Sequence, residues 1–458
     1  MTTTSSHQEL TKTVARWIVD AQTAELPAAV DHHVRRLLVD YFAGVIPGSV
    51  TDVSRAVATH VERNYGGDEA TAIGLGRVSA LGAAFMNGSA AHGLEVDDGY
   101  TPGSVHPSSV SFPSVLAAAE ASSATRELTL RALSVALELT CRLAAAGHPA
   151  TWRNHFHNTP ISGVMGGAAG VAVILGLDET QVRDALGIAA SHAGGLFAFL
   201  NQSAEVKRVH SGKASRDAVA SAELALLGVT GPRSVFEGVH GYIDAFARGE
   251  FARGTLVDGL GDTWVMLNTY VKPYPSCRHL HAPIDGVLAM RTKHGFTSDQ
   301  IAEVVVRTHT VASHHGNQNV ESFLDAQMSI PYAVAVAAKY GEVGLDEFYE
   351  HNRTDVEVNR ITRLTSVVAD AACDADYPRL RPAIVTITLA DGRKIETRID
   401  QPYGEPSNPV TDEDMTAKFL RLAGPLLGDD AERVADELWE FASLDILTDI
   451  QSLLESRP

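Results

Sequence analysis

Apolar residues in the first half of the chain recur at helical spacing. From about residue 8 to residue 227 they fall three and four positions apart, with many Ala and Gly and few β-branched runs. In residues 128–146 the apolar stripe is so wide that the predicted helix should be buried on most sides. The Gly- and Ala-rich segments 81–91 and 163–172 would let neighbouring helices approach closely. This half of the chain predicts a compact helical bundle.

The pattern changes after Trp264, where β-branched runs predict strands. Residues 301–308 and 383–389 are such runs, and residues 394–399 alternate as a hairpin partner would after a short turn. A helix is expected at about 331–339, with its proline in the first turn. These elements predict a small α+β unit.

Beyond Pro409 the pattern is helical again, over residues 411–422 and 430–441, each opened by an N-cap candidate followed by acidic residues. The expected fold class is therefore mainly α with an α+β part. A large all-helical domain should comprise residues 1–267 and 403–458, and a smaller α+β domain should comprise residues 268–402. The helical domain is thus expected to be discontinuous.

Charge and composition narrow the range of partners. The net charge of −19 disfavours nucleic acid and anionic membranes as partners. No apolar run reaches the 18 or so residues of a membrane span, and the polar N-terminus shows no signal-peptide pattern, so we expect a cytoplasmic protein. Cys141, Cys277 and Cys373 lie far apart without a C-x-x-C pair, which favours reduced thiols and gives no support for zinc or an iron–sulfur cluster. We therefore expect no metal.

Acidic residues and histidines gather in residues 92–108, HGLEVDDGYTPGSVHPS. If the preceding helix continues to Asp98, then His92, Glu95 and Asp98 share one face and Asp97 points elsewhere, while the following loop delivers His106. Close carboxylates raise one another's pKa and histidine titrates near neutrality, so this segment could supply an acid and a base. The alternative is a helix end with solvated acids.

Two further segments are basic in an otherwise acidic chain. Residues 205–215 hold Lys207 and Arg208, and Gly212 could open a helix whose free N–H groups attract anions. The alternative for this segment is an exposed basic turn. Residues 155–160 add His157, for which a capping role and a ligand contact are equally open.

The second basic segment, residues 271–285, contains Lys272, Cys277, Arg278 and His281. Two histidines without a third ligand at fixed spacing make a poor metal site, and a partly buried structural role for the cysteine stays open. Cationic clusters on an acidic chain suggest a small, multiply negative ligand, for which a polycarboxylate is the natural choice. No GxGxxG, P-loop or G-x-S-x-G motif is present.

The motifs HGLEVDDGY…HPSS, KRVHSGKAS…GPRSVFEGVHGY, VKPYPSCRHLHAPIDG and PYAVAVA resemble those of the MmgE/PrpD family, in the same order through most of the chain. That family includes 2-methylcitrate dehydratases, cis-aconitate decarboxylases and iminodisuccinate epimerases. The resemblance implies a large all-α domain, a smaller α+β lid domain, homodimers, and a cofactor-independent site in the cleft between the domains.

The resemblance also implies site residues: Glu95 and Asp98 from the acid-rich segment, His106, Lys207, Lys272 and Tyr332. The sequence departs from the family pattern where Glu95-Val96-Asp97-Asp98 stands in place of D-x-D-D. The loop to His106 is about one residue longer than in the decarboxylases, which also place a histidine where Cys277 stands. Both differences weigh against decarboxylation.

The sequence therefore predicts a cofactor-independent lyase for a small di- or tricarboxylate, first a 2-methylcitrate- or citrate-type dehydratase that abstracts an α-proton and expels a β-hydroxyl. The alternatives are a cis-aconitate-type decarboxylase, an epimerase or isomerase of a dicarboxylate, and a non-catalytic polycarboxylate binder. The expected catalytic residues are Glu95, Asp97, Asp98, His106, Lys207 and Lys272, and the expected substrate-binding residues are His157, Arg208, Cys277, Arg278, His281 and Tyr332.

Overall fold

The computed structural model describes residues 9–201, 204–377 and 379–456. Its internal contacts divide the chain into two compact units, Met1–Thr269 with Thr411–Pro458, and Tyr270–Val410. The first unit is almost entirely helical and the second carries a four-stranded sheet with helices, so the expected fold class, mainly α with an α+β part, is confirmed. The lid role expected for the smaller part stays a prediction.

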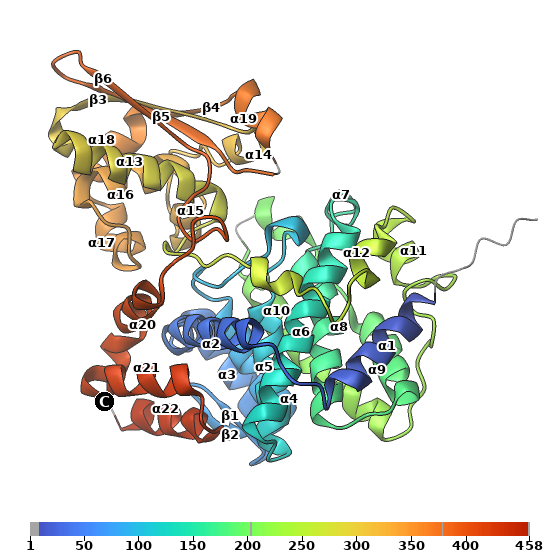
Figure 1. Ribbon diagram of the computed structural model, residues 1–458. Helices are drawn as coiled ribbons and strands as arrows, with labels where there is room; N and C mark the ends of the chain where they lie inside the picture. Colours follow the sequence, from blue (N-terminus) through green and yellow to red (C-terminus); the bar gives the residue numbers. More distant parts are fainter. Residues whose placement is uncertain (1–8, 202–203, 378, 457–458) are drawn as a thin grey trace, which may run out of the picture. The chain divides into compact units, whose positions relative to one another are not determined.

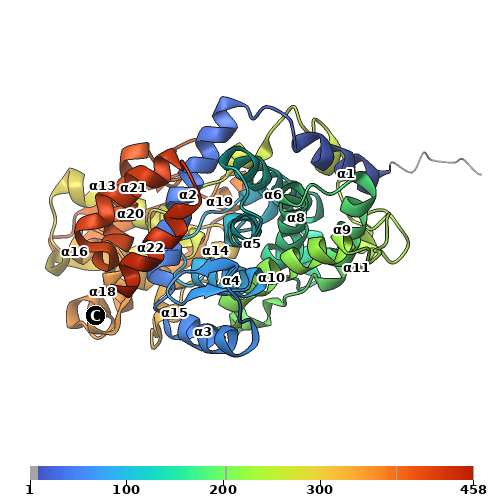
Figure 2. The same cartoon turned by 90° about the horizontal axis from the view of Figure 1, so that it is seen from below.

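Helix α8 (Asn158–Ile174) forms the centre of the first unit (Figures 1 and 2), and all its residues are buried. It packs against α5, α6, α9 and α10. A Cβ at Gly170 would lie 2.6 Å from Val115 Cγ2 and 2.7 Å from the Ala132 carbonyl oxygen, so only glycine permits this approach. The other elements up to residue 269 are α1 (Leu10–Ala21), α2 (Ala28–Gly48), α3 (Asp52–Asn64), β1 (Ala70–Ala72), β2 (Gly76–Val78), α4 (Ala80–Ala91), α5 (Ser108–Ala121), α6 (Arg126–Gly147), α7 (Ala150–Arg153), α9 (Glu179–His192), α10 (Val206–Leu226), α11 (Tyr242–Ala247) and α12 (Arg253–Val257).

The C-terminal segment belongs to the same unit. It comprises α20 (Asp412–Leu427), α21 (Ala431–Glu440) and α22 (Asp445–Glu455). Helix α20 begins after Thr411, whose side chain accepts a hydrogen bond from the backbone N–H of Asp414, and it packs along α2. This packing brings Lys418 of α20 into contact with Val96, more than 300 residues earlier in the chain.

The second unit has one sheet with strand order β4-β3-β5-β6. Strands β3 (Ile301–Thr308), β5 (Ala383–Leu389) and β6 (Lys394–Ile399) pair antiparallel, and the β5–β6 pair is the predicted hairpin, while β4 (Thr365–Ala369) pairs parallel to β3. Helices α13, α16 and α18 lie along the sheet and pack on its strands (Figure 1). The helices of this unit are α13 (His281–His294), α14 (Thr310–Ser313), α15 (Phe323–Gln327), α16 (Ile330–Tyr340), α17 (Glu350–Arg353), α18 (Val356–Leu364) and α19 (Ala371–Asp376).

Among the described residues, no helix is both long enough and apolar enough to cross a lipid bilayer.

Candidate active site

The acid-rich loop follows α4, and its backbone leaves the helix earlier than the sequence predicted. Helix α4 ends at Ala91, His92 is its C-cap, and Glu95 has a positive φ of 58°. The expected continuation to Asp98 is therefore wrong, and His92, Glu95 and Asp98 do not share a helical face. A positive φ costs a residue other than glycine energy, so surrounding contacts must hold this loop in place.

Hydrogen bonds from distant elements hold the loop. The Asp98 carboxylate accepts hydrogen bonds from the Ser108 backbone N–H (3.2 Å) and hydroxyl (2.8 Å) at the start of α5. The Lys418 ammonium donates to the Val96 carbonyl oxygen at 2.7 Å and to Asp40 Oδ1 on α2 at 2.5 Å. Lys418 and Asp40 are both buried, so this ion pair is shielded from water. The loop is thus fixed from α5 on one side and from α2 and α20 on the other.

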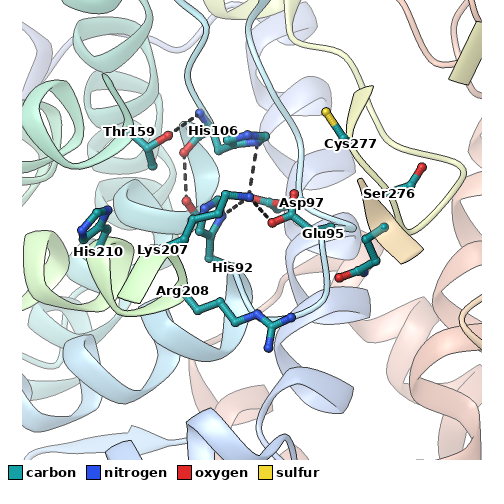
Figure 3. Close-up of polar contacts among 12 residues, drawn as sticks. His92, Glu95, Asp97, His106, Thr159, Lys207, Arg208, His210, Ser276 and Cys277 are labelled. Carbon is teal, nitrogen blue, oxygen red and sulfur yellow. Dashed lines mark hydrogen bonds and ion pairs between the residues drawn. The ribbon is translucent and has the colours of Figure 1, made fainter. Parts of the chain in front are cut away.

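Two histidines share the carboxylate of Asp97 (Figure 3). Asp97 Oδ2 lies 2.7 Å from His92 Nδ1 and 3.4 Å from His106 Nδ1. His106 Nδ1 also lies 2.7 Å from the backbone oxygen of Asp98. A carbonyl oxygen only accepts, so His106 must donate from Nδ1, and in the neutral ring Nε2 then carries the lone pair. The Asp98 carbonyl oxygen therefore orients the His106 ring, and the nearby Asp97 carboxylate favours its protonated form, which is an arrangement suited to general acid–base catalysis.

The exposed fractions separate the two histidines. The His92 side chain is fully buried, while that of His106 is 18% exposed. The two rings lie edge to face, with their centroids 5.1 Å apart. His106 is therefore accessible to a small molecule, whereas Asp97 and His92 are buried next to it.

Lys207 forms a buried ion pair with Glu95, so the basic segment meets the acidic one (Figure 3). Lys207 lies in the first turn of α10, which begins at Val206. Gly212 is therefore inside the helix and does not open it, contrary to the sequence prediction. Arg208, next to Lys207, donates to Glu205 at 2.7 Å. The pairing holds one ammonium group at the acid-rich loop.

His157 and His210 add two neutral imidazoles. Their Nδ1 atoms lie 3.2 Å apart, and the His157 ring centroid lies 6.0 Å from that of His92. Burial, with the neighbouring His92, lowers the pKa of His157 well below its ordinary value and lowers the pKa of His210 to about 4. His157 is the N-cap residue of α8, but its side chain forms no capping hydrogen bond. The hydroxyl of Thr159, the second residue of α8, accepts a hydrogen bond from the backbone N–H of His106 at 3.2 Å.

Asp98 differs from its neighbours in its proton affinity. Burial raises the pKa of its carboxyl group well above the ordinary value, and the nearby Asp40 and Asp97 add to that effect against the hydrogen bonds from Ser108. Asp98 therefore tends to keep its proton.

The remaining predicted site residues lie in the second unit. Lys272 is buried there. Arg278 donates to Glu405 (3.0 Å) and to backbone oxygens of residues 402 and 403, and its NH1 lies 2.8 Å from His281 Nδ1. The Tyr332 hydroxyl donates to the Glu347 carbonyl oxygen at 2.6 Å. Cys277 is half-buried. Within this unit, the contacts of Arg278, His281 and Tyr332 support the local fold.

The structure thus brings together Glu95, Asp97, Asp98, His106, His157 and Lys207, and their catalytic or binding roles stay predictions. Sequence reasoning did not find Asp40 or Lys418, because each is a single charged residue in a helix without any motif around it. Both are charged residues on buried helix faces, and that they pair can be recognised only when α2 is known to pack against α20. In the described ranges, no three His, Cys, Asp or Glu side chains are grouped so as to hold a metal ion.

Comparison with known proteins identifies the family. The MmgE/PrpD N-terminal domain matches residues 12–254, and the MmgE/PrpD C-terminal domain matches residues 274–441. The chain is 28% identical to cis-aconitate decarboxylase-like protein oryM of Aspergillus oryzae, over 99% of this chain and 98% of that protein. It is 26% identical to the cis-aconitate decarboxylases of Aspergillus terreus (97% and 95% covered) and of Homo sapiens (92% and 89% covered). The resemblance seen in the motifs is confirmed: the chain belongs to the MmgE/PrpD family.

Proposed function

We propose that this protein is a cofactor-independent lyase that acts on a small di- or tricarboxylate, with decarboxylation of a cis-aconitate-type acid as the first candidate. The arrangement of His106 on Asp97, next to the Lys207–Glu95 pair, carries the proposal. The relatives named cis-aconitate decarboxylase, similar over most of both chains, favour decarboxylation over the dehydration that the sequence first suggested.

Loss of CO₂ from an unsaturated tricarboxylate leaves an electron pair that spreads over the double bond onto a neighbouring carboxylate. A fixed ammonium group stabilises that charge most where water is scarce, which is the setting of Lys207. An imidazole then returns a proton to carbon, and His106 is the partly exposed imidazole of the group. In this proposal Lys207 binds a substrate carboxylate in place of, or beside, Glu95.

Dehydration stays the second candidate because of Asp98. A carboxyl group whose pKa is raised by burial keeps the proton that a departing β-hydroxyl requires. In that reaction His106 would remove the α-proton, and the same ammonium group would stabilise the enediolate. The expected roles of Lys272 and of the other residues in the second unit, and the expected homodimer, stay predictions.

The test is a substrate panel with matched variants. Purified protein is incubated with cis-aconitate, citrate and 2-methylcitrate, and both released CO₂ and alkene absorbance are followed. We expect CO₂ from cis-aconitate, and we expect Lys207→Met and His106→Asn each to lower kcat by about 10² to 10³. Formation of an alkene from a hydroxy acid without CO₂ would instead select dehydration.

Lys213→Met is the matched control for the lysine variant. Lys213 lies six residues further along α10, its side chain is 38% exposed, and its ammonium donates to the His192 carbonyl oxygen at 2.8 Å. This variant should keep wild-type turnover. If Lys207→Met and His106→Asn also keep it while folding normally, the proposed function is wrong.

A further inference from the structure

Cys277 and His315 form a thiol–imidazole pair within the second unit. Cys277 Sγ lies 3.9 Å from His315 Nε2, and His315 Nδ1 lies 3.0 Å from the Met328 carbonyl oxygen. Because the carbonyl only accepts, Nδ1 carries the hydrogen, and Nε2 of the neutral ring faces the thiol with its lone pair. The nucleophile thus contacts the base, and the base contacts an acceptor that orients it, which is the arrangement that activates a cysteine.

Residues next to this pair carry buried polar atoms without hydrogen-bond partners, and so does Arg381, which acts on the neighbouring His279. In the described part of the chain, Ser276 Oγ, His279 Nδ1 and Arg381 Nε are buried and have no such partner. Ser276 is fully buried and precedes Cys277 directly (Figure 3). The His279 ring stacks on that of His315, with centroids 5.5 Å apart. An unsatisfied buried polar atom costs free energy, so three of them in residues next to this pair and its neighbour His279 suggest that they serve a polar ligand.

The charges around the pair favour an anion. Burial, together with Arg381, lowers the pKa of His279 well below its ordinary value and lowers the pKa of His309 to about 4, so both rings are neutral near pH 7. Burial also lowers the pKa of His315, but Cys277 and the Met328 carbonyl outweigh it, and the pKa ends above the ordinary value. The cations that act on these rings include the guanidinium groups of Arg381 and Arg278 and, after proton transfer, the His315 imidazolium itself.

We propose that Cys277 is a nucleophilic thiol that His315 activates, and that it takes a small carboxylate bearing an electrophilic carbon. The thiol proton passes to His315 Nε2, and the sulfur electron pair forms a bond to that carbon. In a displacement, the leaving group departs with its bonding pair. In an addition to an α,β-unsaturated acid, the π pair moves to the α-carbon, which takes the proton from His315. Arg381 attracts the carboxylate.

The other two cysteines are internal controls. Cys141 and Cys373 are fully buried, and burial raises the pKa of both thiols. Cys277 is half-buried, so it is the thiol that a reagent can reach in the folded protein. An ordinary thiol is about 1% ionised at pH 6.5, so a thiol paired with an imidazolium can react there up to about 100-fold faster.

The test is labelling of the full-length native protein with iodoacetate or iodoacetamide at pH 6.5, followed by peptide mass mapping. We expect Cys277 to react at least about tenfold faster than Cys141 and Cys373, and His315→Gln to slow it about tenfold. His314→Gln, at the neighbouring exposed position, should leave the rate unchanged. Arg381→Gln should lower the iodoacetate rate relative to iodoacetamide. Equal Cys277 rates in wild type and His315→Gln would overturn the proposal.

If His315→Gln does not fold, the pH profile of the wild type decides. Labelling of Cys277 should stay fast below pH 8, because the thiolate is held by His315 in surroundings that also contain Arg278, His279, His309 and Arg381. A rate that falls tenfold per pH unit below about 8.5, as for an ordinary thiol, would contradict the pairing. Mass mapping does not depend on turnover, so this result is separate from the test of the proposed function.

Discussion

Replacement of Lys418 by Met should lower the free energy of unfolding of the first unit more than deletion of a surface charge does. Lys418 and Asp40 are 4% and 2% exposed in their side chains, and the ammonium also holds the Val96 carbonyl oxygen. The variant leaves Asp40 buried without its counter-charge, which typically costs about 3–5 kcal/mol. Because marginal stability is only about 5–15 kcal/mol, such a loss is large.

Urea denaturation followed by tryptophan fluorescence suits this test. The four tryptophans, Trp17, Trp152, Trp264 and Trp439, all lie in the first unit, so the signal reports that unit. The matched control is Arg16→Met, since Arg16 pairs with Glu179 at 3.1 Å with side chains 61% and 35% exposed. An exposed pair of this kind contributes about 1 kcal/mol or less.

A second substitution separates the buried charge from lost packing. In Asp40→Leu with Lys418→Met, both charges are gone and an apolar pair remains, so stability should rise above that of Lys418→Met alone. The reasoning is refuted if Lys418→Met costs no more than Arg16→Met, or if adding Asp40→Leu lowers the stability further.

Three more outcomes are expected. Burial raises the pKa of Asp98, so ionisation of this carboxyl group opposes folding. The variant Asp98→Asn should therefore gain stability relative to wild type as the pH rises from 5 to 8. The control Asp184→Asn should not, because Arg233 lowers the pKa of that carboxyl group. Burial lowers the pKa of His210 to about 4, so the protein should lose stability as the pH falls below about 6.5. The variant His210→Asn should lose less stability than wild type between pH 7 and 5, by on the order of 1 kcal/mol. The control His240→Asn should behave as wild type, because that side chain is 92% exposed. Gly212→Ala should lower the stability by about 1–3 kcal/mol, because its Cβ would collide with Ser89 and with the Phe85 carbonyl on α4. The control is Gly66→Ala, whose Cβ would meet nothing within 4 Å. Thermal denaturation compares the two variants.

Elements whose pattern is local were predictable from the sequence. The two β-branched runs are β3 and β5, the alternating hairpin partner is β6, and the predicted helix at 331–339 is α16, because apolar periodicity is set by the face that each element buries. Strand β4 was not found from the sequence. It is five residues long and mostly exposed or half-exposed, and its existence depends on parallel pairing with β3, some 60 residues earlier.

The errors at the site have one physical origin. The prediction extended the helix beyond Ala91, because the contacts that hold the loop come from Ser108, Lys418 and the histidines, which lie elsewhere in the pattern. Gly212 looked like a helix opener, yet it lies inside α10, where α4 approaches too closely for a side chain. A single sequence shows that a glycine is present but not whether a turn or a neighbouring helix requires it.

The discontinuous first unit gives the C-terminal segment a direct connection to the candidate chemistry. Asp97 and the Asp98 carbonyl oxygen keep their places beside His106 only while the loop after α4 keeps its shape, and Lys418 from α20 donates to the backbone of that loop. The same ammonium neutralises Asp40, one of the charges that raise the pKa of Asp98. Packing of α20 on α2 therefore acts on the position of the histidine and on the protonation of the neighbouring acid together. Substitutions in α20 should for this reason change the pH dependence of turnover as well as stability, although α20 contributes no residue to the proposed acid–base pair.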